Sequence, residues 1–202
     1  RKVPGAGAAH LQESLNVTEP GPKLSVCSIA LRDKSAAEAF RIVAEAGYRN
    51  VEVFASVPGT HAFRDMAGAE RARIRDLAGR NGLRICAMAG SVGAGFTADS
   101  EAEREDELSR VKMDIDLAAD IGAPLARVGP GAGEDIDKVM SRAAPYLRRA
   151  AAYAEQKRLR LGIENHGGSI TVNPDHAAAL CREVGSSSFG IIYDPGNLFG
   201  RQ

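Results

Sequence analysis

The chain has 202 residues, and its 26 Lys and Arg balance its 26 Asp and Glu, so the formal net charge is zero. This balance, together with the lack of a basic run, argues against nucleic acid or an anionic membrane surface as a partner. No stretch approaches the roughly 18 consecutive apolar residues of a membrane-spanning helix, and the length predicts one main domain.

The three cysteines, Cys27, Cys86 and Cys181, lie far apart and form no CxxC pair. This pattern favours reduced thiols over a disulfide framework or a structural zinc site. Reduced thiols are typical of the cytoplasm, so we expect a cytoplasmic protein. A processed export signal would leave the same sequence behind, so this expectation rests on the cysteines alone.

The elements can be predicted in chain order from the hydrophobic periodicity. Residues 1–23 are rich in Pro and Gly, which predicts an extended N-terminal arm. From residue 24, short apolar runs alternate with stretches whose apolar residues lie three and four apart, the pattern of repeated βα units. Strands are predicted at residues 24–29, 50–55, 83–88, 125–128, 160–164 and 190–194. Helices are predicted at residues 35–46, 67–81, 101–121, 135–156 and 174–184.

The ends of these helices carry boundary signals. Ser35 and Glu38 have the spacing of a capping box, and Gly47 lies where a left-handed cap is needed. Asn173 can cap a helix whose first residue is Pro174. These signals agree with the ranges that the periodicity predicts.

The spacing of the βα units predicts a (β/α)8 TIM barrel, in which eight units typically need about 250 residues. Residues 24–202 hold about six units, so we predict a partial TIM barrel domain that further residues or another chain would complete. An open doubly wound sheet is the alternative fold. No GxGxxG follows the first strand, so a dinucleotide-binding fold has little support.

Two of the predicted strands end in a carboxylate. The run LGIENHG places Glu164 and His166 after one strand, and IIYDPGN places Asp194 after the next. In βα barrels the carboxyl ends of the strands form the rim that holds the active site. Two carboxylates beside an imidazole suit a divalent cation such as Mn²⁺ or Mg²⁺. Each acid alone would as readily cap the next helix, but together they favour a site.

The stretches LRLGIENHGG, NPDHAAALCREVG and GIIYDPGNL resemble strands five and six of the xylose-isomerase-like TIM barrels, the superfamily of sugar phosphate isomerases and epimerases. The opening, LSVCSIALRDKSAAEAFRIVAEAGYRNVEVFA, is similar to their first strand, first helix and second strand. The resemblance runs over about residues 24–199. It implies that Glu164 and Asp194 are metal ligands, that Glu164 also serves as an acid or base, and that Glu52 lies near the substrate. In such enzymes a His on strand seven and a Glu on strand eight usually complete the metal set.

Other polar residues have two interpretations each. Glu52 either faces the substrate or forms a structural ion pair with Arg127. His166 lies two residues beyond Glu164, and we expect it to bind substrate or to hydrogen-bond a ligand. Asn197 either orients substrate or holds the turn after the sixth strand.

Two loops carry weaker signals. His61, in the loop after the second strand, is expected to be exposed to solvent. The run Gly129-Pro130-Gly131 and its neighbours can offer backbone N–H groups to a phosphate, although flexible loops of this composition are more common.

The motifs and the resemblance together predict a divalent-metal-dependent isomerase or epimerase that acts on a sugar or sugar-like polyol by proton transfer through an enediolate. Mn²⁺ and Mg²⁺ suit the carboxylates best, and Zn²⁺ or Co²⁺ also fit. The expected partner is a small sugar, and analogy with the superfamily permits a homo-oligomer. One alternative is a non-catalytic barrel fragment that lacks the last two ligands. A less favoured one is an apurinic-site endonuclease, whose expected His after the sixth strand is replaced here by Pro195, Gly196 and Asn197.

Overall fold

A single parallel sheet forms the centre of the fold, in a computed structural model that describes residues 24–199 apart from 57 and 91. The predicted arm at residues 1–23 lies outside the described residues. The strands are β1 (Val26–Cys27), β2 (Asn50–Ser56), β3 (Ala62–Phe63), β4 (Arg84–Ala89), β5 (Leu125–Arg127), β6 (Arg160–Glu164) and β7 (Phe189–Ile192). They follow the order β1-β2-β4-β5-β6-β7, β3 pairs with β2, and all pairs are parallel.

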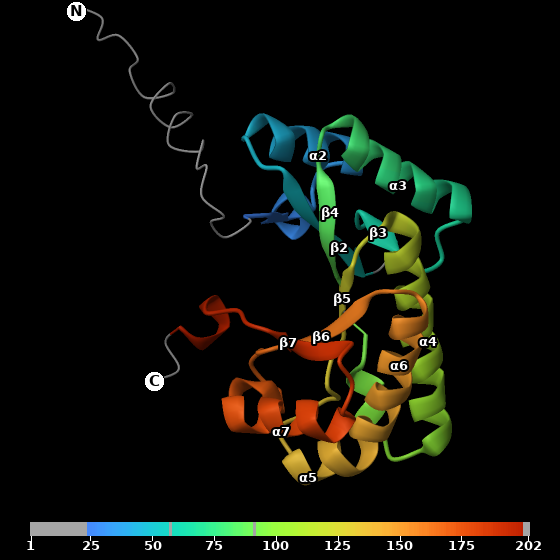
Figure 1. The fold of residues 1–202 in the computed structure, drawn as a ribbon, viewed down its shortest axis with the longest axis vertical. Helices are drawn as coiled ribbons and strands as arrows, with labels where there is room; N and C mark the ends of the chain where they lie inside the picture. The colour runs from blue at the N-terminus through green and yellow to red at the C-terminus, as the bar shows by residue number, and fades with distance from the viewer. Residues whose placement is uncertain (1–23, 57, 91, 200–202) are drawn as a thin grey trace, which may run out of the picture.

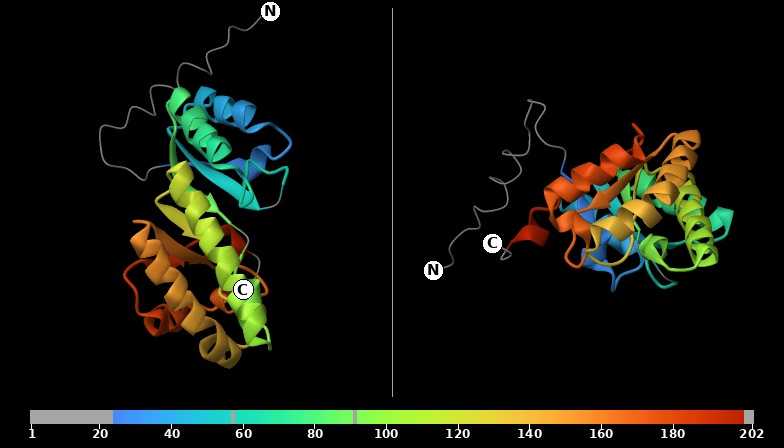
Figure 2. Two further views of the ribbon diagram at one scale, coloured as in Figure 1. Left: turned by 90° about the vertical axis from the view of Figure 1, so that its right-hand side faces the viewer. Right: turned by 90° about the horizontal axis from the view of Figure 1, so that it is seen from below.

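The helices alternate with the strands along the chain. They are α2 (Ala36–Glu45), α3 (Gly68–Arg80), α4 (Glu101–Ile121), α5 (Ile136–Lys138), α6 (Ala144–Gln156) and α7 (Pro174–Val184). Helices α3, α4 and α6 lie along one side of the sheet, which Figure 2 shows from their side. The fold is therefore the α/β fold of a TIM barrel, open between β1 and β7 within the described residues.

The hydrophobic core lies between the sheet and these helices. Met88 of β4 and Ile163 of β6 are fully buried there, as are Leu117 of α4 and Leu147 of α6. Because successive side chains of a strand point to opposite faces, burial of Ile163 against the helices leaves Glu164 on the other face. The packing of the core thus selects the residues that point into the barrel.

Local capping signals explain the helix ends well. The Glu38 N–H donates to Ser35 Oγ at 3.3 Å, and Glu38 Oε2 accepts from the Ser35 N–H at 3.1 Å, which confirms the predicted capping box. Asn173 accepts from the Asp175 N–H at 2.9 Å and starts α7 as predicted. Helices α4 and α7 have the predicted bounds.

The first strand is shorter than predicted. Only Val26–Cys27 pairs in the sheet, and Ser28–Leu31 forms a 3-10 helix. Ser28 Oγ accepts from the Phe54 N–H and contacts His61 Nδ1, both at 2.8 Å, while His61 Nε2 lies 3.3 Å from the Lys34 carbonyl oxygen. These contacts hold Ser28 outside the sheet, so the strand ends at Cys27. The expectation of an exposed His61 is therefore wrong, since its exposed fraction is 5%.

The helix predicted at residues 135–156 contains a π-helical segment. Residues Val139–Ala143 form this segment between α5 and α6. Pro145 follows at the start of α6. Because proline has no N–H to donate to the preceding turn, a wider turn accommodates it without ending the helix.

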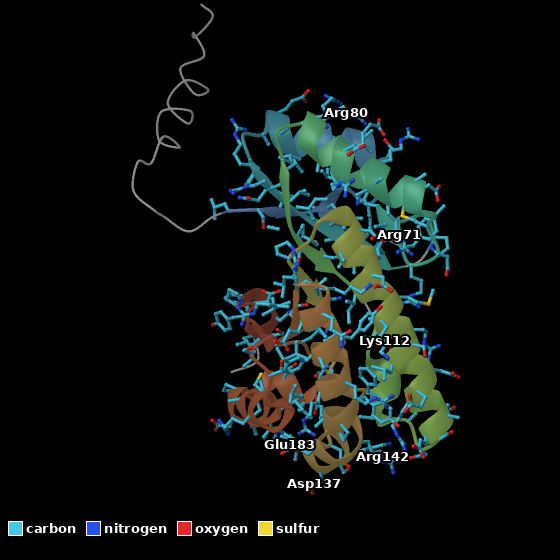
Figure 3. The ribbon with its side chains drawn as sticks, turned by 45° about the vertical axis from the view of Figure 1, so that its right-hand side comes forward. Arg71, Arg80, Lys112, Asp137, Arg142 and Glu183 are labelled. Carbon is cyan, nitrogen blue, oxygen red and sulfur yellow. The ribbon has the colours of Figure 1, made fainter. Side chains whose placement is uncertain are left out.

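The outer surface of the helices is charged. Exposed residues on this side include Arg80 at the end of α3 and Glu183 in α7 (Figure 3).

In the part of the chain that the structure describes, no helix combines the length and the apolar character needed to cross a membrane.

Candidate active site at the carboxyl ends of the strands

The inner face of the sheet gathers charged residues from strands that are far apart in sequence. The register pairs Cys27 with Glu52 and Arg127 with Gly162. Paired residues of neighbouring parallel strands point to the same face, and Glu164 shares that face with Gly162 two residues earlier. The side chains of Arg127 and Glu164 can therefore meet above a glycine.

An ion pair joins these two side chains. Arg127 Nη1 donates to Glu164 Oε2, and Arg127 Nε donates to the Gly90 carbonyl oxygen at 2.7 Å. Asn197 Nδ2 donates to the other carboxylate oxygen, Oε1, at 3.1 Å. The turn that carries Asn197 lies on the opposite side of the sheet from α4 and α6 (Figure 1). The Glu164 carboxylate, whose side chain is only 15% exposed, is thus held from two sides.

A cavity of about 210 Å³ opens beside this ion pair. Its polar lining includes Arg127, Glu164, His166 and Ser169, and the remaining lining comes from the loops after β4 and β5. A more open hollow of about 450 Å³ lies near Arg148 and the loop that leads into β7. That hollow is at the amino ends of the strands, where barrel residues serve stability, so the smaller cavity at the rim is the candidate site.

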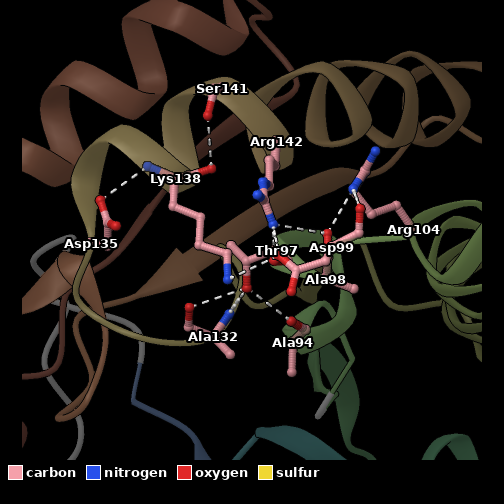
Figure 4. Close-up of polar contacts among 10 residues, drawn as sticks. All are labelled: Ala94, Thr97, Ala98, Asp99, Arg104, Ala132, Asp135, Lys138, Ser141 and Arg142. Atoms are coloured by element: carbon pink, nitrogen blue, oxygen red, sulfur yellow. Dashed lines mark hydrogen bonds and ion pairs between the residues drawn. The ribbon is translucent and has the colours of Figure 1, made fainter. Parts of the chain in front are cut away.

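Close packing between two loops forms one wall of the cavity. A Cβ on Gly93 would lie 2.3 Å from the Gly129 carbonyl oxygen, and the Gly129 N–H donates to the Val92 carbonyl oxygen at 2.7 Å. The Ala132 N–H donates to Thr97 Oγ1 at 2.9 Å (Figure 4). Two N–H groups of the glycine-rich run are therefore used within the protein, and the glycines allow the loops to approach each other.

An outer layer of ion pairs holds the same loop in place. Arg142 pairs with the exposed carboxylate of Asp99 and lies within 3.4 Å of the Thr97 carbonyl oxygen (Figure 4). Arg142 and the nearby Lys138 both lower the pKa of Asp99. Arg104 Nη1 donates to the Ala98 carbonyl oxygen at 2.6 Å. These contacts satisfy carbonyl groups at the end of the 3-10 helix Ala94–Thr97, so they support the wall and do not enter the cavity.

The end of β6 is held by side-chain hydrogen bonds to its backbone. Thr171 Oγ1 donates to the Glu164 carbonyl oxygen at 2.6 Å and accepts from the His166 N–H at 3.3 Å. Asn165 Nδ2 donates to the Asp194 carbonyl oxygen and Asn165 Oδ1 accepts from the Asp194 N–H, each at 2.6 Å. The buried Asn165 therefore aligns the ends of β6 and β7.

The other predicted site residues lie around this centre. His166 is exposed at the cavity, and its Nδ1 lies 3.0 Å from the Gly167 carbonyl oxygen. Asp194 Oδ1 accepts from the Gly196 N–H at 2.7 Å. Neither Asp194 nor Glu52 is part of the cavity lining formed by the described residues.

Glu52 lies next to Cys27 on the inner face. Burial raises the pKa of the Cys27 thiol to about 12, and the charge of Glu52 and its hydrogen bond to the thiol add to this rise. Arg127 has the opposite effect on the same thiol, so it lies close to this pair. The proposed ion pair between Glu52 and Arg127 is not what the structure shows, since Arg127 pairs with Glu164.

The residues that could hold a metal ion do not form a complete site within the part of the chain that the structure describes. Within residues 24–199, apart from 57 and 91, no three His, Cys, Asp or Glu side chains lie close enough together to hold a metal ion. Glu164 and Asp194 supply carboxylates of the type that hard cations prefer, but Glu164 already binds Arg127 and Asn197. These two carboxylates therefore do not make up a metal site within the described residues.

Arg127 was not predicted as a site residue, and of the two interpretations of Glu52 the ion pair with Arg127 is absent, since Arg127 pairs with Glu164. The sequence showed an arginine between Ala126 and Val128 in an apolar strand, and this alternation could have indicated an inward-pointing charge. Its partner could not be read from the sequence, because two carboxylates, Glu52 and Glu164, lie on the same face.

Residues 40–202 match the family described as Xylose isomerase-like TIM barrel. The chain belongs to this family. No curated protein matches its sequence.

Several solved structures share the fold of this xylose isomerase-like chain. A D-tagatose 3-epimerase-like protein is 18% identical with a TM-score of 0.72, and covers 87% of this chain and 66% of its own. D-psicose 3-epimerase in the presence of D-fructose is 17% identical with a TM-score of 0.69, and the match covers 86% of this chain and 63% of the epimerase chain. A xylose isomerase-like TIM barrel protein from Mycobacterium smegmatis, in complex with magnesium, is 18% identical with a TM-score of 0.65. The match covers 87% of this chain and 65% of the Mycobacterium smegmatis chain.

These comparisons confirm the predicted superfamily and fold. The similar structures include sugar epimerases, and one was solved with magnesium. The chain spans about two thirds of the length of these structures. At this level of identity the likeness establishes the fold alone.

Proposed function

We propose that this chain carries the acid/base residue of a sugar isomerase or epimerase and that this residue is Glu164. The observation that carries the proposal is a half-buried carboxylate beside a cavity at the carboxyl ends of the strands. Sugar epimerases are among the proteins that share the fold. The substrate would be a sugar or sugar-like polyol.

The chemistry follows from the groups around the cavity. Glu164, as a carboxylate, would remove a proton from the carbon beside a carbonyl group, and returning it to another face or carbon would give the epimer or isomer. Arg127 and Asn197 hold its two oxygens, which limits its motion. His166 and Ser169 would offer hydrogen bonds to the hydroxyl groups of a sugar.

A divalent cation, with Mn²⁺ or Mg²⁺ favoured, belongs to this proposal. Glu164 and Asp194 would hold it together with ligands from outside the described residues, because these two carboxylates do not complete a site. When bound, such an ion would stabilise negative charge on the substrate oxygens. The magnesium in the Mycobacterium smegmatis structure supports the use of a divalent ion in this family.

The test is solvent deuterium exchange into ketoses such as D-fructose, D-psicose and D-tagatose, in the presence of Mn²⁺. We expect the wild type to catalyse exchange and Glu164→Gln to lose about 10²–10⁴-fold of the rate, since an amide cannot accept the proton. Glu155→Gln changes an exposed carboxylate of α6 in the same way and should keep the wild-type rate. Exchange by Glu164→Gln at the wild-type rate would contradict the proposal.

A further inference from the structure

Arg127 provides a positive charge at the position where the proposed function requires a cation. Its side chain is 28% exposed and that of Glu164 is 15% exposed, so both lie at the edge of solvent. A carboxylate this poorly hydrated needs a compensating positive group or hydrogen bonds. The ion pair with Arg127 and the Asn197 amide meet this need with groups of the chain itself.

The guanidinium is held in place independently of Glu164. Arg127 Nε donates to the Gly90 carbonyl oxygen at 2.7 Å. A Cβ on Gly90 would lie only 3.0 Å from the Arg127 carbonyl oxygen, so the end of β4 packs closely against β5. The hydrogen bond to Gly90 can therefore persist when the contact with Glu164 opens, and the positive charge then stays at the rim.

Two cations cannot share Glu164 without repelling each other. A divalent ion on Glu164 would lie a few ångströms from the guanidinium, where the Coulomb interaction between like charges is strong in a partly buried site. Asn197 adds no charge, Glu52 lies beside Cys27, and the Asp194 carboxylate, which would share the ion, offsets part of the repulsion. The repulsion would therefore be only partly offset.

We propose that Arg127 is the built-in counter-ion of Glu164 and sets the affinity of the rim for divalent cations. In this role Arg127 is a positioning residue: it keeps the carboxylate in place in the absence of a metal ion, and its ion pair must open before Glu164 binds one. The inference rests on the proposed role of Glu164 as a metal ligand, and it adds that the wild-type chain binds metal more weakly than its carboxylates would allow.

The test is titration of the full 202-residue chain with Mn²⁺, following the electron paramagnetic resonance signal of the free ion. We expect Arg127→Gln to bind Mn²⁺ about tenfold more tightly than the wild type or better, because the repulsion is removed and Glu164 is released. Arg127→Lys keeps the charge and should bind close to the wild type. If Arg127 had only a structural role, Arg127→Gln would instead weaken Mn²⁺ binding.

Control variants separate the charge near Glu164 from the overall charge. Arg160→Gln removes the same charge from the exposed start of β6, four residues before Glu164, and should leave the affinity unchanged. Adding Glu164→Gln to Arg127→Gln should abolish the gain in Mn²⁺ affinity. Circular dichroism checks folding, and Arg127→Met, which keeps the apolar stem, replaces Arg127→Gln if that variant does not fold.

The outcomes distinguish the inference from the proposed function. Measurable binding by the wild type with no tightening in Arg127→Gln overturns the counter-ion role alone. Absence of Mn²⁺ binding in every variant overturns the binding of a divalent ion by Glu164 in this chain, and the counter-ion role with it. If the double variant Arg127→Gln with Glu164→Gln still binds Mn²⁺ more tightly than the wild type, the inference is also overturned, because the gain in affinity would not depend on Glu164.

Discussion

Glu164 is held in position by contacts from three other segments of the chain. Its backbone is held by Thr171, and its two carboxylate oxygens are held by Arg127 and Asn197. Each contact comes from a different segment of the chain. A carboxylate restrained in this way is suited to a reaction that needs a fixed distance between base and substrate.

Ser28 has a structural role that a substitution can measure. The Ser28 hydroxyl accepts a hydrogen bond from the Phe54 N–H. The Lys34 carbonyl oxygen can only accept, so a neutral His61 ring carries its proton on Nε2, and the Ser28 hydroxyl then donates to His61 Nδ1. Ser28→Ala leaves the buried His61 ring and the partly buried Phe54 N–H without this partner, so we expect a loss of about 1–3 kcal/mol in the free energy of unfolding. Urea unfolding of Ser28→Ala beside the exposed control Ser25→Ala checks this. Equal stability of the two variants would contradict the role.

Cys27 should be unreactive in the folded protein at mildly alkaline pH. Burial raises its pKa from 9.0 to about 12, so at pH 9 the folded thiol is almost fully protonated while an unfolded one is half ionised. We expect iodoacetamide to modify Cys27 about two to three orders of magnitude more slowly in the native than in the urea-unfolded chain, because the thiolate is the nucleophile. Peptide mass spectrometry measures both rates.

The same shift links Cys27 to stability. The folded state keeps a proton that the unfolded state releases, so this contribution is full below about pH 9 and is lost as the pH rises towards about 12. Native and unfolded chains that react with iodoacetamide equally fast at pH 9 would show that the thiol is not shielded.

At the scale of elements, the site depends on how closely the loops after β4 and β5 approach. Gly93 has a φ of 112°, and a Cβ there would meet Gly129 backbone atoms at 2.3 and 2.7 Å. We expect Gly93→Ala to lower the free energy of unfolding by more than about 2 kcal/mol, because backbone strain and a backbone clash add. Urea unfolding gives the value.

Gly133 is the matched control for this prediction. Its φ is 86°, and no atom lies within 4 Å of an added Cβ. Gly133→Ala should therefore cost only the conformational strain, about 1–2 kcal/mol. If Gly93→Ala costs no more than Gly133→Ala, the close approach of the loops does not contribute to stability.

Most of the elements could be predicted from local signals. The bounds of α4 and α7 agree with the periodicity, and the Ser35 capping box is present, because capping and amphipathic spacing involve residues within one or two turns. The two-residue strand β3 was not predicted, since Ala62–Phe63 is too short to show a period. The π-helical segment before Pro145 was missed because its hydrophobic pattern is still that of a helix.

At the scale of the whole molecule, the described strands form a barrel wall that is open between β1 and β7. The inner face of this wall is where Cys27, Glu52, Arg127 and Glu164 gather, and the outer face packs against the helices. Chain order sets this arrangement, because right-handed βα units place consecutive parallel strands side by side. The prediction of a partial barrel is confirmed, and the metal-ligand roles of Glu164 and Asp194 stay predictions.

The sequence by itself determined the alternation of strands and helices, the family, and the strand end at which Glu164 and Asp194 lie. These follow from short-range periodicity and from motifs that span a few residues. Only the tertiary structure decided that Arg127 pairs with Glu164 instead of Glu52, and that His61 is buried. Both depend on contacts between segments at least 26 residues apart, such as Ser28 with Phe54, and pairing at that range is chosen by packing of the whole sheet and not by local pattern.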